Sequence, residues 1–237
     1  AKLDGAELKE FSRAEWQAAY DACAPNLIAA MEPAANNIRD YNDHLLCKTV
    51  EWTSPDGGKV GRIVRGLTRV GVYVPGGTAA YPSSVLMNAV PAKVAGVKEI
   101  VMVTPPTENL NQAVLAAAKI TGVDRVIGVG GVQAVAALMY GAGFIPRVDK
   151  LVGPGSAYVA AAKRMAYGTV DIDMVAGPSE ILIVADDTAN PKFVAADLMS
   201  QAEHDKLASP MLLTTSQALA EAVDQEIIRQ MSYLERS

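Results

Sequence analysis

Residues 70–106 of the 237-residue chain read VGVYVPGGTAAYPSSVLMNAVPAKVAGVKEIVMVTPP, and this stretch decides the fold. It contains two near-continuous apolar runs, VGVYV (70–74) and EIVMV (99–103), which are typical of strands buried on both faces of a parallel sheet. The Ala-rich segment between them (83–95) predicts a helix. A strand, a helix and a second parallel strand form a right-handed crossover, so the stretch predicts an α/β fold.

The same alternation continues along the rest of the chain. Apolar runs predict further strands at 124–129, 149–153, 180–185 and 210–215. Helical patterns lie around and between them at 110–120, 131–140, 155–166, 190–204 and 216–230. We therefore expect a doubly wound, mostly parallel sheet with Rossmann-like units over residues 70–237, which can divide into two packed sub-domains near residue 145.

The first 69 residues have a different pattern. Apolar side chains recur at helical spacing and predict one long helix or two, near 13–24 and 25–42. Ser12, followed three residues later by Glu15, has the spacing of a capping box at a helix start. Residues 47–72 alternate and contain the turn Asp56-Gly57-Gly58, so we expect a β-hairpin there. Residues 1–69 are thus predicted to be a helical segment plus a hairpin.

The composition excludes several classes of protein. Hydrophobic residues make up 50% of the chain, which is too many for a disordered segment. The net charge of −5 argues against a nucleic-acid partner, and no apolar run reaches the ~18 residues of a membrane span. Two cysteines, Cys23 and Cys47, cannot form a disulfide framework and are interpreted as structural. We expect a cytoplasmic protein without a membrane or nucleic-acid partner.

Five loops rich in glycine or proline adjoin the predicted strands: PGGT (75–78), TPP (104–106), VGGVQ (129–133), VGPGS (152–156) and AGPSE (176–180). In an open α/β sheet, ligands bind beyond the carboxyl ends of the strands, where glycine lets the backbone approach them. The alternative is that these residues only make tight turns. No G-x-G-x-x-G fingerprint followed by an acidic residue is present, and no Walker-type loop is present either.

Two further patterns carry possible chemistry. In SQAEHD (200–205), Gln201 and His204 are three residues apart and share a helix face, where they could be two zinc ligands. The alternative is that His204 only ends a helix and interacts with its dipole. Tyr73 ends a strand just before PGGT, where its phenol could contact a ligand or could be a core residue with a satisfied hydroxyl. We assign His44 no role.

Long strings of this chain resemble the histidinol dehydrogenase family. They are residues 70–106, VGGVQAVAALMYG (129–141), IPRVDKLVGPGSAYVAAAKR (145–164) and DIDMVAGPSEILIVADDTANPKFVAADLMSQAEHD (171–205). The resemblance implies oxidation of L-histidinol to L-histidine in two NAD-dependent steps through histidinaldehyde. It also implies zinc as a second cofactor, a role in histidine biosynthesis, and a homodimer.

The resemblance implies a role for particular positions. Tyr73, Gln133 and Ser156 match the NAD-contacting residues, although the family motif reads GPGN where this chain reads GPGS. Ser179 matches a residue that contacts substrate. Gln201 and His204 match residues that bind both zinc and substrate.

Family chains are nearly twice as long as this one. The part that this chain lacks carries the general base and two further zinc ligands, so we expect no catalytic base within residues 1–237 and little activity from this chain alone. Two alternatives stay open. One is a related zinc- and NAD-dependent dehydrogenase with another polar alcohol as substrate, and the other is a non-catalytic remnant that keeps the fold.

Overall fold

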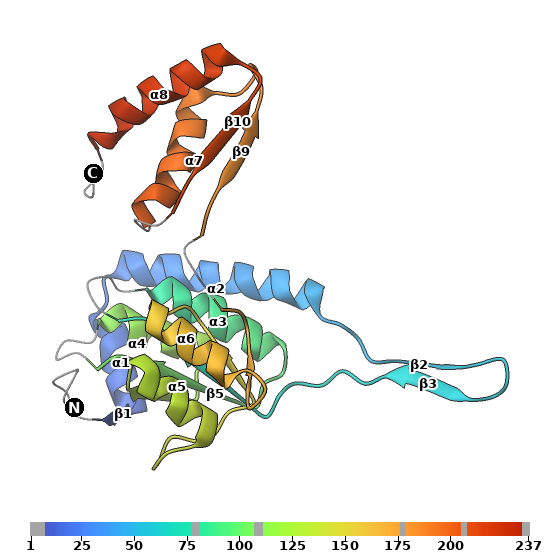
Figure 1. Ribbon diagram of the computed structural model, residues 1–237. Helices are drawn as coiled ribbons and strands as arrows, with labels where there is room; N and C mark the ends of the chain where they lie inside the picture. The colour runs from blue at the N-terminus through green and yellow to red at the C-terminus, as the bar shows by residue number, and fades with distance from the viewer. Residues whose placement is uncertain (1–7, 77–80, 107–110, 176–178, 205–207, 234–237) are drawn as a thin grey trace. The chain divides into compact units, whose positions relative to one another are not determined.

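The computed structural model describes residues 8–76, 81–106, 111–175, 179–204 and 208–233. The chain divides into two compact units, residues 1–176 and residues 177–237. Figure 1 shows the elements of both units. Across the described ranges, no helix combines the length and the apolar character needed to cross a membrane.

Unit 1 is built on a six-stranded sheet with the order β1-β6-β5-β4-β7-β8. Strands β4 to β8 run parallel, and β1 pairs antiparallel with β6 at one edge. Near-continuous apolar sequence in the central strands leaves them buried on both faces. The strands are β1 (Lys9–Phe11), β4 (Arg69–Tyr73), β5 (Glu99–Thr104), β6 (Arg125–Gly128), β7 (Lys150–Val152) and β8 (Asp171–Ile172).

Helices cover both faces of this sheet, as Figure 1 shows. Alternate residues of a strand point to opposite faces. Val72 therefore packs in a core cluster with α1 (Arg13–Ala22), α2 (Pro25–Leu45), α3 (Pro82–Val94) and α4 (Gln112–Thr121). Its neighbour Tyr73 packs in a second cluster with α5 (Gly131–Tyr140) and α6 (Ala157–Ala166).

The amino-terminal helices belong to this core. The expected capping box at the start of α1 is confirmed, because Ser12 accepts from the Glu15 N–H and Glu15 accepts from the Ser12 N–H. Trp16 of α1 is buried in the cluster that covers the sheet. Helices α1 and α2 thus belong to the layer of helices that covers one face of the sheet in unit 1.

The expected hairpin is also confirmed. Strands β2 (Val50–Thr53) and β3 (Lys59–Arg62) pair antiparallel, with Trp52 opposite Val60. All eight strand residues are exposed, Trp52 included, so neither face of the hairpin is covered by the described part of the chain.

Unit 2 has its own small sheet. Strands β9 (Leu182–Ala185) and β10 (Met211–Thr214) pair parallel. Helices α7 (Pro191–His204) and α8 (Gln217–Met231) pack with them around a core of Val194, Ala195, Leu198, Leu219 and Val223.

The division into units differs from the expected one near residue 145. That position lies inside unit 1, because β7 pairs with β4 and continues the same sheet. The boundary between the units falls after residue 176. The sheet is also not continuous through residue 237, since β9 and β10 pair only with each other among the described strands.

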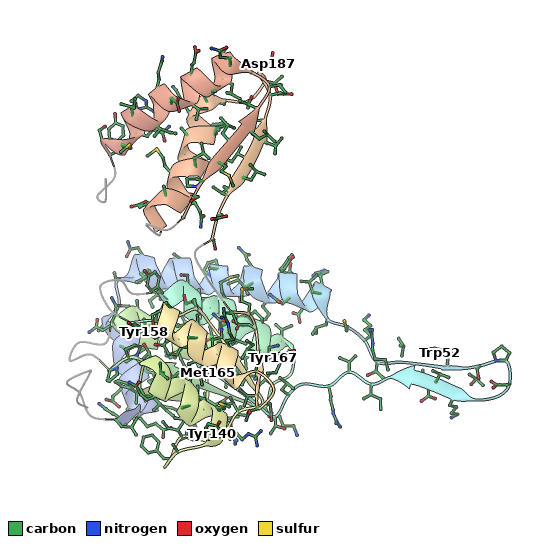
Figure 2. All side chains as sticks on the ribbon, viewed as in Figure 1. Trp52, Tyr140, Tyr158, Met165, Tyr167 and Asp187 are labelled. Atoms are coloured by element: carbon green, nitrogen blue, oxygen red, sulfur yellow. The ribbon has the colours of Figure 1, made fainter. Side chains whose placement is uncertain are left out.

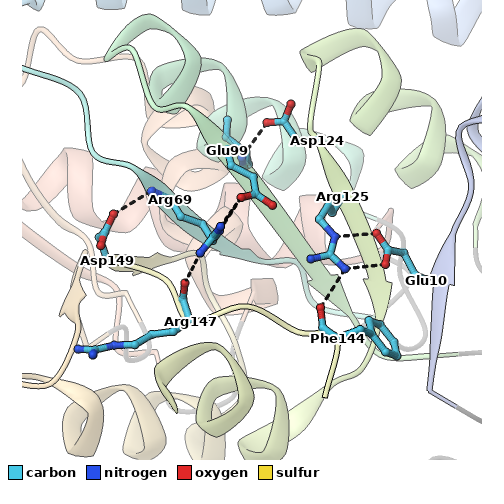
Figure 3. A network of polar contacts seen from close by, with 9 residues as sticks. Glu10, Arg69, Glu99, Asp124, Arg125, Phe144, Arg147 and Asp149 are labelled. Carbon is cyan, nitrogen blue, oxygen red and sulfur yellow. Dashed lines mark hydrogen bonds and ion pairs between the residues drawn. The ribbon is translucent and has the colours of Figure 1, made fainter. Parts of the chain in front are cut away.

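A polar network joins the strands at their amino ends (Figure 3). The Arg69 guanidinium donates to Glu99 at 2.6 Å and to the carbonyl oxygen of Arg147 at 2.9 Å. The Arg69 backbone N–H donates to Asp149 at 2.8 Å, which ties β4 to the segment entering β7. These contacts fix the starts of the strands, and so the register with which their opposite ends emerge.

A second ion pair of this network, between Arg125 and Glu10, holds the edge strand β1. Arg125 of β6 makes two hydrogen bonds to the Glu10 carboxylate of β1, at 2.7 and 2.6 Å. The Arg125 hydrogen bonds hold the pKa of Glu10 below its ordinary value, and Glu10 in turn raises the pKa of Arg125.

Candidate functional site

The strand order of unit 1 marks the carboxyl ends of its parallel strands as the candidate position for a ligand. From β4 the chain continues to β5 and β6 on one side, then returns to place β7 and β8 on the other side of β4. The boundary between β4 and β7 is therefore a topological switch point. In open α/β sheets, ligands bind there, beyond the carboxyl ends of the strands.

Three loops meet at this edge. A Cβ atom added to Gly130, after β6, would lie 2.5 Å from Cγ of Pro105, and one added to Gly76, after β4, would lie 3.2 Å from Cδ of the same proline. Thr104, at the end of β5, is fully buried, and its hydroxyl has no hydrogen-bond partner within the described ranges. Gly77 and Thr78 of PGGT lie outside the described residues.

The side chains of Tyr73 and Gln133 both lie near Gly131, at the start of α5. The Tyr73 side chain is buried, and its hydroxyl accepts a hydrogen bond from the Gly131 N–H at 3.0 Å. Gly131 has a φ of +66°, and a Cβ there would lie 2.9 Å from Oε1 of Gln133. Tyr73 is thus a core residue with a satisfied hydroxyl, and it also stands at the carboxyl edge of the sheet.

Ser156 begins α6 on the other side of the switch point. Its hydroxyl oxygen accepts from the Val159 N–H at 3.4 Å, so the side chain is the N-cap of the helix. A Cβ on the preceding Gly155 would overlap the Val159 side chain. The GPGS loop therefore runs close to the first turn of α6, and Ser156 itself is exposed.

Unit 2 contains the remaining candidates. The Gln201 side chain, on α7, donates from Nε2 to the carbonyl oxygen of Ser179 at 3.0 Å. This bond uses the donor end of the amide and leaves the oxygen as the end that can act as a ligand. His204 is the last residue of α7, and its side chain lies outside the described residues, as do residues 176–178 and Asp205.

The described residues do not form a complete metal site. No group of three or more His, Cys, Asp or Glu side chains comes together within the described ranges. His44 is exposed on α2, where its Nδ1 contacts the Asp40 carbonyl at 2.7 Å. This backbone hydrogen bond raises the pKa of His44 above its ordinary value.

One pair of charged residues at this edge was not anticipated. Lys163 of α6 is buried and pairs with Asp173, which follows β8. Both residues also bond to Gly153 in the GPGS loop. No motif marks them, because their contacts depend on the packing of α6 over β7 and β8.

The fold defines a class of protein first. An order of 3-2-1-4-5 for the five parallel strands is that of a doubly wound, Rossmann-like sheet. Solved aldehyde dehydrogenases share the fold. Aldehyde dehydrogenase 21 from Physcomitrella patens matches with a TM-score of 0.60 at 14% identity, covering 93% of this chain and 50% of that chain.

Sequence comparison then gives the family. The histidinol dehydrogenase family model matches residues 1–237, and the chain belongs to that family. It is 53% identical to the histidinol dehydrogenase of Clostridium acetobutylicum, covering 100% of this chain and 56% of that protein. It is 52% identical to the histidinol dehydrogenase of Listeria innocua, covering 100% of this chain and 56% of that protein.

A solved structure agrees. The crystal structure of histidinol dehydrogenase from Elizabethkingia anophelis matches with a TM-score of 0.94 at 40% identity, covering 99% of this chain and 55% of that one. The chain spans about half the length of the curated relatives it matches.

Proposed function

We propose that this chain is the cofactor-binding portion of a histidinol dehydrogenase, an oxidoreductase that uses NAD to convert L-histidinol to L-histidine in histidine biosynthesis. The observation that carries the proposal is the switch point between β4 and β7, where glycine loops gather at the carboxyl edge of a nucleotide-binding sheet. Membership of the family supplies the substrate.

The residues at this edge fit a dinucleotide. Gly130, Gly131 and Gly153 lack side chains that would strike neighbouring protein atoms, so the loops can lie close together where we propose that the dinucleotide binds. Ser156 caps the Val159 N–H, and the remaining N–H groups of the first turn of α6 would be available to a diphosphate. Tyr73, Gln133 and Ser156 surround these loops and are the proposed NAD contacts. The Ser156 hydroxyl already caps α6, so its bond to NAD would use the hydroxyl proton.

The residues that we propose contact the substrate are all in unit 2. We assign substrate contacts to Ser179, Gln201 and His204, and zinc contacts to the last two. The Gln201–Ser179 hydrogen bond supports this assignment, because it orients the amide oxygen as a ligand. A zinc site needs at least three protein donors. Gln201 and His204 supply two donors, and we propose that the remaining donors come from the part of the relatives' length that these 237 residues do not span.

The chemistry divides between the two groups. Tyr73, Gln133 and Ser156 would hold NAD, which would supply the hydride acceptor for oxidation of the alcohol, and a second NAD molecule would be needed for oxidation of the hydrated aldehyde. Gln201 and His204 would hold the amino alcohol, and Ser179 would fix its orientation. Taking the hydroxyl proton needs a base, and the proposed site residues of this chain do not include one.

NAD titration into the purified chain tests the cofactor assignment. Isothermal calorimetry should detect NAD binding, and Gln133→Ala should weaken it. Gln17→Ala, an exposed glutamine on α1, is the matched control. Ser156→Asn restores the residue usual in the family and should tighten binding. A wild-type chain that does not bind NAD would sink the assignment.

Zinc binding has a control within the chain. Of the two histidines, we expect only His204 to respond when zinc is titrated and the imidazole proton resonances are followed. His204→Ala should remove the response, and His44→Ala should leave it intact. An equal response of both histidines would indicate nonspecific binding and would count against the site.

Turnover separates this proposal from its alternatives. With NAD, zinc and L-histidinol, the chain alone should form no NADH at an enzymatic rate, because the proposed site residues include no base and only two metal donors. The longer protein should oxidise L-histidinol in preference to other polar alcohols. If the longer protein prefers another alcohol, the result would favour a related dehydrogenase. If the longer protein neither binds NAD nor turns over substrate, the result would favour a non-catalytic remnant.

We also propose that the complete protein is a cytoplasmic homodimer. The exposed hairpin supports the dimer, because Trp52 is 55% exposed and Val60 is 45% exposed, and exposed apolar groups of this kind mark interaction sites. Free Cys23 and Cys47 agree with a reducing compartment. Sedimentation of the wild type and of Trp52→Ser would test the dimer, since loss of the tryptophan should weaken association.

A further inference from the structure

A buried lysine lies behind the proposed cofactor loop. Lys163 is in α6, and its side chain is only 2% exposed (the Asp173 side chain is 28% exposed). Its ammonium group forms an ion pair with the carboxylate of Asp173 and donates to the carbonyl oxygen of Gly153 at 2.8 Å. The lysine therefore links α6, the segment after β8 and the loop after β7.

Asp173 completes the link from the other side. Its Oδ2 accepts from the Gly153 N–H at 2.8 Å, and its Oδ1 accepts from the Met174 N–H at 2.7 Å. Both polar groups of the Gly153 main chain are thus bound by this one ion pair. Gly153 is held with a φ of +109°, a conformation that favours glycine, and lies directly against the backbone of Tyr73.

Stability alone is a weak reason for such a pair. Removing a charge from water is costly, and a buried ion pair can often be replaced by apolar side chains without loss of stability. This pair is also at the carboxyl edge of the sheet, beside the switch point, whereas the other ion pairs of β4 to β7 are at the amino ends. The position of the pair therefore indicates a role in the loop that begins at Gly153.

We infer that Lys163 and Asp173 are positioning residues that hold Gly153–Ser156 in the shape that receives the cofactor. The inference rests on the proposed function for the identity of that cofactor. Without the lysine, the Gly153 carbonyl loses its donor and Asp173 loses its counter-charge. The loop can then leave the Tyr73 backbone, and NAD meets a site that has to be ordered on binding.

The test compares the Lys163–Asp173 ion pair with the ion pair that joins β7 to β8. Lys163→Met removes the ammonium and replaces the rest of the side chain with an unbranched apolar chain of similar shape. Lys150→Met is the matched control, because Lys150 of β7 pairs with Asp171 of β8 at 2.6 Å, on the amino side of the sheet. Two readouts are measured on the 237-residue chain: NAD affinity by calorimetry, and hydrogen exchange of the amides of Gly153, Gly155 and Ser156.

We expect Lys163→Met to weaken NAD binding by about tenfold or more and to speed exchange of the loop amides by a similar factor. Lys150→Met should change neither, even where it lowers the melting temperature. Lys163→Gln is the second variant if Lys163→Met fails to fold. It leaves no unpaired ammonium in the interior and keeps a donor for the Gly153 carbonyl, so its effects should be in the same direction and smaller.

Two results would overturn the inference. One is loop exchange and NAD affinity in Lys163→Met equal to the wild type. The other is an equal loss in Lys163→Met and Lys150→Met, which would make the pair a general structural contact. If the wild type binds no NAD, the proposed function fails instead, and the amide exchange still decides whether the pair holds the loop.

Discussion

The backbone of Gly153 lies against the backbone of Tyr73, so close that a Cβ on Gly153 would overlap the Tyr73 carbonyl oxygen. The contact joins β4 to the loop after β7, across the switch point of the sheet. A residue with a side chain would push these two segments apart at the place where we expect the cofactor.

Gly153→Ala should therefore destabilise the chain by about 2 kcal/mol or more, because it adds both an unfavourable φ and an overlap. Gly168→Ala is the control, since Gly168 has a similar φ of +94° and no atom within 4 Å of its added Cβ. Urea unfolding of both variants separates the two effects. Equal losses would mean that the Tyr73 contact contributes nothing.

Tyr73→Phe should cost about 1–2 kcal/mol of unfolding free energy, because the Gly131 N–H loses its acceptor in a partly buried place. Tyr158→Phe is the control, since Tyr158 is 77% exposed on α6 (Figure 2). If the two variants are equally stable, the hydroxyl of Tyr73 has no structural role.

Glu15 gives a pH-dependent prediction. Hydrogen bonds from Lys9 and from the Ser12 backbone lower the pKa of Glu15 from 4.5 to about 2. A lowered folded-state pKa stabilises the fold above pH 4.5, and this contribution disappears as pH falls toward 2. The melting temperature of the wild type should exceed that of Glu15→Gln at neutral pH, and the difference should shrink across this range. A difference independent of pH would contradict the ion pair.

Arg69→Met should destabilise the chain by about 2 kcal/mol, because it leaves the Glu99 carboxylate and the Arg147 carbonyl without their donor. Lys59→Met in the exposed hairpin removes an ion pair that is 77% and 69% exposed, and it should change the free energy of unfolding by less than about 0.5 kcal/mol. Thermal unfolding measures both. A larger loss in the hairpin variant would reverse the interpretation of the network.

Most elements could be predicted from local patterns. The apolar run VGVYV is typical of a buried strand and the alternation around Asp56-Gly57 is typical of a hairpin, and the structure confirms both elements. Strand β1 was not predicted. It is three residues long and forms only by pairing with β6, so its partner is 115 residues away and no local pattern could indicate it.

The sequence also could not predict that the parallel strands divide between the six-stranded sheet of unit 1 and the β9–β10 sheet of unit 2. Strands β7 and β9 both have apolar runs, but only the pairing of β7 with β4 places it in the larger sheet. Of the candidate site, Gly-rich loops were visible in the sequence, and their meeting at Pro105 required the fold. Lys163 resembles any lysine in an Ala-rich helix, and only its burial distinguishes it.

The inaccessibility of Lys163 also makes it a chemical reporter. Reagents that acetylate amines act on lysines that solvent can reach, and Lys163 is shielded by its own helix and the loop beneath it. Mass spectrometry of partially acetylated protein would therefore find this position unmodified until the loop opens. The rate at which Lys163 is acetylated would therefore measure how often the loop opens. A bound dinucleotide should lower that rate.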